Sequence, residues 1–139
     1  MENKQIVVII QARTDSRRFP KKVLYKIKGK PLLWHVIDRI KHFECDDIVV
    51  ATTKRKIDDE IVRIAKTSGV KFFRGKKYDV LDRYYQAAIK FRAKTIIRIS
   101  ADCPLIDPNI SREVLKKFQK GNYDYVATDD KTCPKGVDI

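Results

Sequence analysis

The sequence has little of what holds small disulfide-bonded or zinc-bound folds together. Its 139 residues contain three cysteines, Cys45, Cys103 and Cys133, which are widely spaced and odd in number. No Cys-x-x-Cys pair and no Cys/His pattern with zinc-ligand spacing occurs. The sequence therefore supports neither a disulfide framework nor a zinc site, and a reducing cytoplasm is the expected location.

Long hydrophobic runs are also missing. The first residues, MENKQ, are polar, and the apolar run that follows them is too short for a signal peptide or a membrane span. No repeat, low-complexity tract or linker interrupts the chain. We therefore expect a soluble protein without a membrane partner, folded as one domain over residues 1–139.

The two common glycine-rich phosphate motifs are absent. No G-x-x-x-x-G-K-[ST] sequence occurs, and the turn at residues 29–31 lacks the second glycine and the hydroxyl of that motif. There is no G-x-G-x-x-G sequence either. These absences disfavour a P-loop ATPase and an ordinary NAD-binding domain.

Positive charge is abundant and unevenly placed. The formal net charge is +13, and residues 1–42 hold eleven lysines and arginines against three acids. Such a surplus favours anionic partners: nucleotides, phosphorylated sugars, nucleic acid or an anionic membrane surface. Further lysines, such as Lys116, Lys117 and Lys120, are more simply interpreted as a solvated helix face.

Apolar periodicity predicts an α/β fold. Five consecutive β-branched residues, Ile6 to Ile10, suit a strand buried on both faces. Helical spacing of apolar residues follows Pro31, Ile57, Asp79 and Pro108. The remaining strands are predicted at residues 48–51, 70–73, 95–99 and 125–127. Alternating strands and helices imply a three-layer α/β/α domain with a mostly parallel, Rossmann-like sheet.

A parallel sheet would bring several polar loops to one edge. Loops leaving strand carboxyl ends share a crevice, which is where such sheets bind ligands. Cations there suit phosphate oxygens, and a carboxylate suits Mg²⁺, so we expect a magnesium nucleotide. The residues expected to face this crevice are Arg13, Arg18, Lys22, Arg74 and Asp102.

Each of these residues also has a simpler interpretation. The first loop, residues 11–22, is alternatively a solvated basic loop. Asp102 is alternatively a capping carboxylate in a turn, although Asp107 is better placed to cap the last helix. Likewise, Asp79 is expected to cap a helix, and Arg83 on that helix is alternatively paired with a surface acid.

Four ordered blocks resemble one known family. The pattern Gln11-Ala12-Arg13-x-x-Ser16-x-Arg18-Phe19-Pro20-x-Lys22, followed by Gly29-Lys30-Pro31, is similar to the start of cytidylyltransferases that make CMP-activated acidic sugars. Three later blocks resemble the spore-coat polysaccharide branch of that family. They are 73–75 with 79–84, 101–106, and 134–138.

The resemblance implies a nucleotide-diphospho-sugar transferase-like fold whose first loop wraps CTP. By position it implies Mg²⁺ binding by Asp102 and transfer of CMP to an acidic sugar with loss of pyrophosphate. Catalysis would rest on positioning and charge neutralisation by Arg13, Lys22 and Asp102. The nucleotide-binding residues implied are Gln11, Arg13, Ser16, Arg18, Lys22, Arg74 and Arg83.

Two departures from the family pattern limit that expectation. Lys21 stands where the family usually has glycine, and family members continue well past residue 139, with a second metal-binding aspartate and much of the sugar site there. We therefore expect the N-terminal part of a longer family fold: a fragment, a naturally truncated relative or a protein completed by a partner. Nucleotide binding is expected rather than turnover. The sugar acceptor and a homo-oligomeric state stay open. The alternatives are a sugar-phosphate nucleotidyltransferase using another nucleoside triphosphate and a non-catalytic basic module for an acidic partner or, less favoured, nucleic acid.

Overall fold

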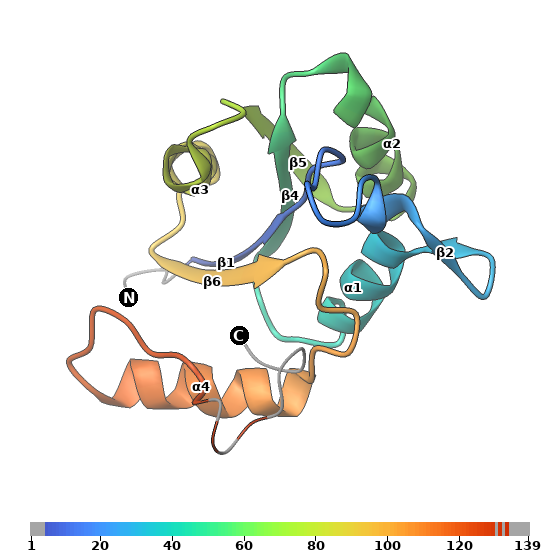
Figure 1. Cartoon of the computed structure of the whole chain (residues 1–139). Helices are drawn as coiled ribbons and strands as arrows, with labels where there is room; N and C mark the ends of the chain where they lie inside the picture. The colour runs from blue at the N-terminus through green and yellow to red at the C-terminus, as the bar shows by residue number, and fades with distance from the viewer. Residues whose placement is uncertain (1–4, 130, 132, 134–139) are drawn as a thin grey trace.

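A four-stranded parallel sheet forms the centre of the protein (Figure 1). The computed structural model describes residues 5–129, 131 and 133. The strand order is β5-β4-β1-β6, so the first strand lies inside the sheet. This arrangement confirms the predicted α/β class. The bounds are β1 (Ile6–Gln11), β4 (Asp47–Thr53), β5 (Lys71–Gly75) and β6 (Thr95–Ser100).

Helices cover both faces of the sheet (Figure 1). The helices α1 (Leu32–Ile40) and α2 (Asp59–Thr67) lie on one face and α3 (Val80–Lys90) lies on the other. The helix α4 (Pro108–Lys120) follows β6. None of the helices in the described part of the chain is long and apolar enough to cross a bilayer. Short elements complete the fold: η1 (Lys22–Leu24), β2 (Lys26–Ile27), β3 (Lys30–Pro31) and η2 (Lys56–Asp58).

The strand β1 divides the core in two. Val8 and Ile10 face α1 and α2, whereas Val7 and Ile9 face α3. All four side chains are fully buried. Because successive strand residues point to opposite faces, a run of β-branched residues without alternation is what a strand covered on both sides requires.

Local capping signals place the helices largely as predicted. The Asp79 carboxylate accepts a hydrogen bond from the Asp82 amide, and Asp107 accepts bonds from two amides of α4. Gly69 ends α2 with φ 71°, a left-handed conformation that glycine adopts at little cost. Pro31 precedes α1 rather than forming its first residue, because it pairs with β2 as part of β3.

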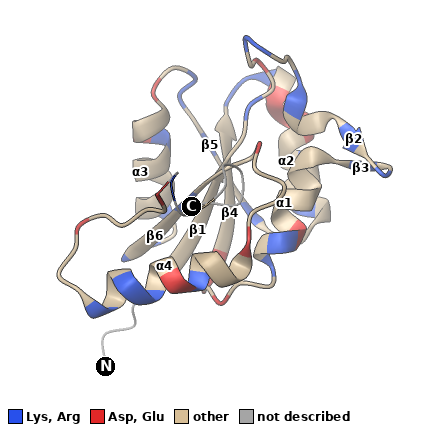
Figure 2. Ribbon diagram, turned by 60° about the horizontal axis from the view of Figure 1, so that its bottom comes forward, with Lys and Arg blue, Asp and Glu red and all other residues tan. Residues whose placement is uncertain are grey.

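The predicted strand at residues 125–127 is wrong. These residues form no regular secondary structure in the part of the chain that is described, and Tyr125 is 75% exposed. The apolar face predicted for α4 is only half-buried, and its Leu115 alone packs against the main core. Lys116, Lys117 and Lys120 of α4 are exposed, as expected for a solvated face. Basic residues recur along the ribbon of this helix (Figure 2).

The apolar pattern of α3 is only partly buried. Tyr84 and Ala88 pack on the sheet, but Leu81, Tyr85 and Ile89 face solvent. The buried stripe through which α3 contacts the sheet is narrower than the spacing of its apolar residues predicts. Arg83, a charged residue, occupies one of the buried positions instead.

The thiol of Cys45, which lies between α1 and β4, is an unusually weak acid because its pKa is raised. Burial raises its pKa to about 11, and Asp46 and Asp47 add to the rise. Because the thiolate is the nucleophile, alkylation of Cys45 by iodoacetamide should be slow near neutral pH. Its rate, followed by mass spectrometry, should climb steadily with pH toward about 11. A rate that levels off at a pH typical of exposed thiols would contradict this.

Candidate functional site

The carboxyl ends of the four parallel strands lie at one edge of the sheet (Figure 1). Gln11, at the end of β1, is in register with Ala51 on one side and Ser100 on the other. The backbone pairing continues one residue further, because the Ala12 amide donates to the Ala51 carbonyl and the Ala101 amide donates to the Gln11 carbonyl. The loops that leave this edge carry most of the predicted site residues.

A buried carboxylate fixes the first loop to this edge. The side chain of Asp58 is fully buried and accepts hydrogen bonds from the Thr14 amide (2.9 Å) and the Thr14 hydroxyl (2.7 Å). Its other oxygen accepts a bond from the Thr53 hydroxyl. These bonds join the loop after β1 to the end of β4 and the start of α2. The loop that carries the predicted cations is therefore anchored at its base.

Lys21, the departure from the family pattern, has a left-handed backbone. Its φ is 57°, a conformation that glycine adopts more cheaply than lysine. Its amide donates to the Thr14 carbonyl at 2.6 Å, which folds the loop back on itself. The side chain is exposed, so the lysine is accommodated without crowding the core.

Lys22 and Asp102 meet across the sheet edge. The Lys22 Nζ lies 2.6 Å from Asp102 Oδ2, although 80 residues separate the two. The Ser100 hydroxyl donates to the other oxygen of Asp102 at 2.5 Å. Burial by itself raises the pKa of Asp102, but the hydrogen bonds from Lys22 and Ser100 outweigh it and leave the pKa below its ordinary value. Asp102 is therefore a carboxylate at neutral pH.

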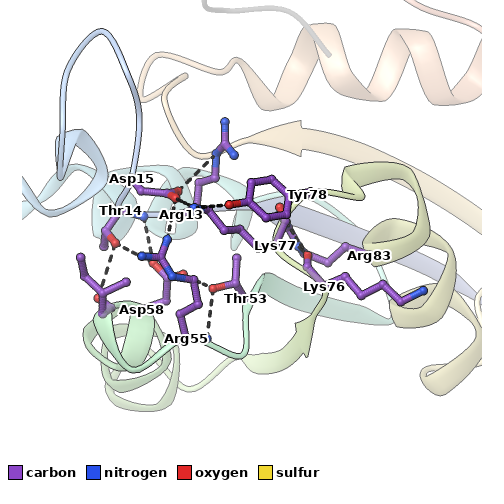
Figure 3. Close-up of polar contacts among 11 residues, drawn as sticks. Arg13, Thr14, Asp15, Thr53, Arg55, Asp58, Lys76, Lys77, Tyr78 and Arg83 are labelled. Carbon is purple, nitrogen blue, oxygen red and sulfur yellow. Dashed lines mark hydrogen bonds and ion pairs between the residues drawn. The ribbon is translucent and has the colours of Figure 1, made fainter.

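A second polar cluster surrounds Asp15 (Figure 3). Arg55 Nη1 and Lys77 Nζ lie 2.6 Å and 2.9 Å from Asp15 Oδ2. Arg13 Nε is 3.8 Å from Asp15 Oδ1. The hydrogen bond from Lys77 is the main reason that the pKa of Asp15 is lowered. Arg13 thus lies in a cluster of its own loop and two neighbouring loops, separate from the Lys22–Asp102 pair.

The guanidinium groups of Arg74 and Arg83 donate hydrogen bonds to backbone carbonyls of neighbouring loops. Arg74 donates to the carbonyls of Thr53 (2.8 Å) and Arg55 (2.6 Å), and it pairs with Asp59 at 2.6 Å. Arg83 is fully buried, so its side chain does not lie on the surface. Its Nε and Nη2 donate to carbonyls of the loop after β5. Both arginines therefore shape the site through the loops that they fix.

The remaining predicted residues lie at or near the same edge. Gln11 is half-buried at the end of the inner strand β1, and Ser16 is half-buried in the first loop. Arg18 is exposed. Within the described residues, no hydrogen bond or ion pair holds the side chains of Ser16 and Arg18. Both are therefore available to a ligand.

The donor set fits a metal that arrives with a nucleotide. No group of three or more His, Cys, Asp or Glu side chains gathers as a metal cage among the described residues. Asp102 offers an ionised carboxylate beside Lys22 of the first loop. Mg²⁺ is commonly held by one or two carboxylates together with water and substrate phosphates, and one ionised aspartate is compatible with such a site.

Several residues of the site were missed at the sequence level. Ser100 donates a hydrogen bond to Asp102 and is the last residue of β6. Its position at the end of a strand is the sequence feature that could have identified it. Asp15, Arg55 and Lys77 lie in loops that were predicted to reach the edge, but loop composition does not say which acid meets which cation. No feature of the sequence indicates the buried hydrogen bonds of Asp58, because the pattern around this residue also fits an exposed helix start.

Comparisons with known proteins identify the family of the chain. The cytidylyltransferase family model matches residues 7–138. The chain is 41% identical over 125 residues to an uncharacterized protein of Methanocaldococcus jannaschii, covering 89% of this chain and 51% of that protein. It is 31% identical over 128 residues to the spore coat polysaccharide biosynthesis protein SpsF of Bacillus subtilis, covering 87% and 53%.

Solved structures show the same fold. A cytidylyltransferase from Leptospira borgpetersenii superposes with a TM-score of 0.90 at 31% identity, covering 98% of this chain and 59% of that one. A CMP:2-keto-3-deoxy-manno-octonic acid synthetase complexed with CTP superposes with a TM-score of 0.73 at 26% identity, covering 84% and 48%. The chain spans about half the length of the curated relatives it matches. The match of the family model over residues 7–138 shows that the chain belongs to the cytidylyltransferase family.

Proposed function

We propose that the sheet edge binds CTP with Mg²⁺ for transfer of CMP to an acidic sugar. The observation that carries the proposal is the contact between Lys22 and Asp102, which joins the basic first loop to the loop after β6. A cation for phosphate oxygens and an ionised carboxylate for a metal thus lie side by side where an open parallel sheet binds its ligands. A sugar acceptor would complete the reaction.

The reaction needs little from the protein beyond placement and charge. An acceptor hydroxyl forms a bond to the α-phosphorus of CTP, and the bond from that phosphorus to the oxygen shared with the β-phosphate breaks. Pyrophosphate leaves, and the hydroxyl proton is lost to solvent. Lys22 and Arg13 would hold phosphate oxygens, with Ser16 as a hydroxyl donor. Asp102, oriented by Ser100, would hold Mg²⁺, which when bound neutralises negative charge on the phosphates.

The relatives support the same chemistry. One neighbour in fold is a synthetase of a CMP-activated sugar acid, and its structure contains CTP. A relative in sequence belongs to spore coat polysaccharide biosynthesis. These are properties of those proteins, and they favour CTP over other nucleotides and an acidic sugar over a sugar phosphate for this one.

A pyrophosphate-release assay tests the proposal. CTP, UTP, ATP and GTP would each be offered with Mg²⁺ and a panel of acidic sugars and sugar phosphates, and equilibrium binding of each nucleotide would be measured in parallel. We expect CTP to bind best and to release pyrophosphate only with an acidic sugar. Preference for another nucleotide with a sugar phosphate would contradict the proposal. So would nucleic-acid binding with a steep salt dependence and no saturable CTP site.

Replacement of Asp102 tests the metal ligand. In Asp102→Asn, Mg²⁺ should no longer strengthen CTP binding, while metal-free affinity should not fall, because the substitution removes a negative charge and releases Lys22. We expect the loss to be roughly tenfold or more in the metal-dependent part, measured by calorimetric titration with and without EDTA. Glu113→Gln on α4 removes an exposed carboxylate that also pairs with a lysine, and it should change neither value. An unaltered Mg²⁺ response in Asp102→Asn would remove Asp102 from the site.

A further inference from the structure

Three loops direct their cations at a single carboxylate. Arg13 follows β1, Arg55 follows β4 and Lys77 follows β5, and these are neighbouring strands of the sheet. All three side chains contact Asp15, at 3.8, 2.6 and 2.9 Å (Figure 3). The cluster lies at the same sheet edge as the Lys22–Asp102 pair, and Arg13 and Lys22 flank the same first loop.

The single negative charge of Asp15 does not balance the positive charges around it. Three positive side chains face one negative charge, so a surplus of positive charge remains. Asp15 Oδ1 is buried yet accepts no hydrogen bond in the described structure, and Arg13 Nε at 3.8 Å is too far to donate one. The Arg13 side chain is 38% exposed and that of Arg55 is 40% exposed, so both remain accessible. Asp15 therefore leaves part of the positive charge of this cluster uncompensated.

A buried arginine supports the loop that carries Lys77. Arg83 is fully buried, and its Nη1 has no hydrogen-bond partner in the described part of the chain. Its Nε and Nη2 donate to the Lys76 carbonyl, and Nη2 also donates to the Lys77 carbonyl at 2.7 Å. Burial lowers the pKa of Arg83, and the nearby charge of Arg13 lowers it further. Arg83 therefore fixes the backbone from which Lys77 reaches Asp15 and keeps one donor unsatisfied.

We infer that Arg13, Arg55 and Lys77 form a binding site for a phosphate group, and that Asp15 is an internal counter-ion which the phosphate displaces. The inference rests on the proposed nucleotide site and adds Arg55, Lys77 and Asp15 to it. A terminal phosphate offers three acceptor oxygens and more charge than a carboxylate, so it satisfies three cations that Asp15 leaves partly unsatisfied. The exchange breaks and forms only ion pairs and hydrogen bonds.

Displacement of Asp15 makes an unusual prediction for a residue inside a binding site. Removing its charge should strengthen anion binding, because the phosphate no longer competes with a resident carboxylate. We expect Asp15→Asn to bind inorganic pyrophosphate roughly 3- to 10-fold more tightly than the original protein at low salt, without metal. Asp15→Ser, which removes the charge and most of the side chain, should show the same gain. Glu60→Gln changes the net charge equally but lies in a separate pair with Arg63, and it should leave the affinity unchanged.

Adjacent lysines provide a matched test of the cations. Lys77 contacts Asp15, whereas Lys76 pairs loosely with Asp82 and is 74% exposed. In the Asp15→Asn background, Lys77→Ala should reverse the gain in pyrophosphate affinity and Lys76→Ala should not. Equal effects of the two lysines would mean nonspecific attraction and would overturn the inference.

The remaining outcomes also decide the matter. If Asp15→Asn and Asp15→Ser bind pyrophosphate no better, or worse, than the original protein, Asp15 only ties the loops together and the inference fails. The proposed function fails differently, through the absence of CTP selectivity or of pyrophosphate release. Binding of pyrophosphate by this cluster is measured without either, so the two results are distinguishable.

Discussion

Lys22→Ala should weaken Mg²⁺-dependent CTP binding by about 2 kcal/mol, or roughly 30-fold in Kd. The ammonium group lies 2.6 Å from Asp102 and is 28% exposed, so it is held beside the proposed metal ligand yet remains accessible to a phosphate. Its loss removes one charged donor to the triphosphate and leaves Asp102 without its cation. Equilibrium titration with CTP and Mg²⁺ measures the change.

Lys22→Ala should have little effect on the stability of the fold. Partly exposed ion pairs contribute about 0–1 kcal/mol to stability, so the urea midpoint of Lys22→Ala should stay close to that of the original protein. Lys116→Ala, which removes a lysine paired with Glu113 on α4, is the matched control and should keep CTP affinity. If Lys22→Ala and Lys116→Ala weakened CTP binding equally, general positive charge rather than a defined site would explain the affinity.

Asp58→Ala should lower the free energy of unfolding by about 3 kcal/mol. The carboxylate is fully buried and accepts bonds from the Thr14 amide and hydroxyl and from the Thr53 hydroxyl. Truncation leaves the Thr14 amide and the Thr53 hydroxyl without their acceptor, and the Thr14 hydroxyl keeps only a long contact of 3.5 Å with the Ile57 carbonyl. Each unsatisfied buried group costs about 1–3 kcal/mol before relaxation. Urea unfolding followed by circular dichroism gives the difference.

The neighbouring aspartate provides the control for Asp58. Asp59 is 55% exposed and pairs with Arg74, so Asp59→Ala should cost less than about 1 kcal/mol. Asp58→Asn keeps an acceptor for Thr14 and should fall between the two. Equal unfolding midpoints for Asp58→Ala and Asp59→Ala would show that Asp58 does not anchor the first loop.

Much of the fold was predictable because its signals are local. The β-branched run of β1 is compatible with a strand covered on both faces, and the caps at Asp79 and Asp107 use bonds within one turn. The failures occur where burial depends on distant packing. Leu81 and Tyr85 have helical spacing, but nothing in the pattern shows that α3 meets the sheet through Tyr84 and Ala88 instead.

The site was predictable only as far as topology places it. A parallel sheet brings loop ends to one edge, which is how Lys22 and Asp102 come together across 80 residues. Topology does not determine the direction in which each side chain points. Arg74 turns to carbonyls of the β4 loop, and Arg83 is buried beneath the β5 loop, because unpaired backbone carbonyls there compete for guanidinium donors. Composition alone does not decide that competition.

Paramagnetic mapping of the bound nucleotide tests the central claim most directly. Amide spectra of ¹⁵N-labelled protein would be recorded with CTP and Mg²⁺, and then with Mn²⁺ in place of Mg²⁺, which broadens signals close to the metal. We expect CTP-dependent shifts in the first loop and broadening centred on Asp102, both lost in Asp102→Asn. Broadening centred elsewhere, such as on α4, or the absence of saturable shifts in the first loop, would contradict the account.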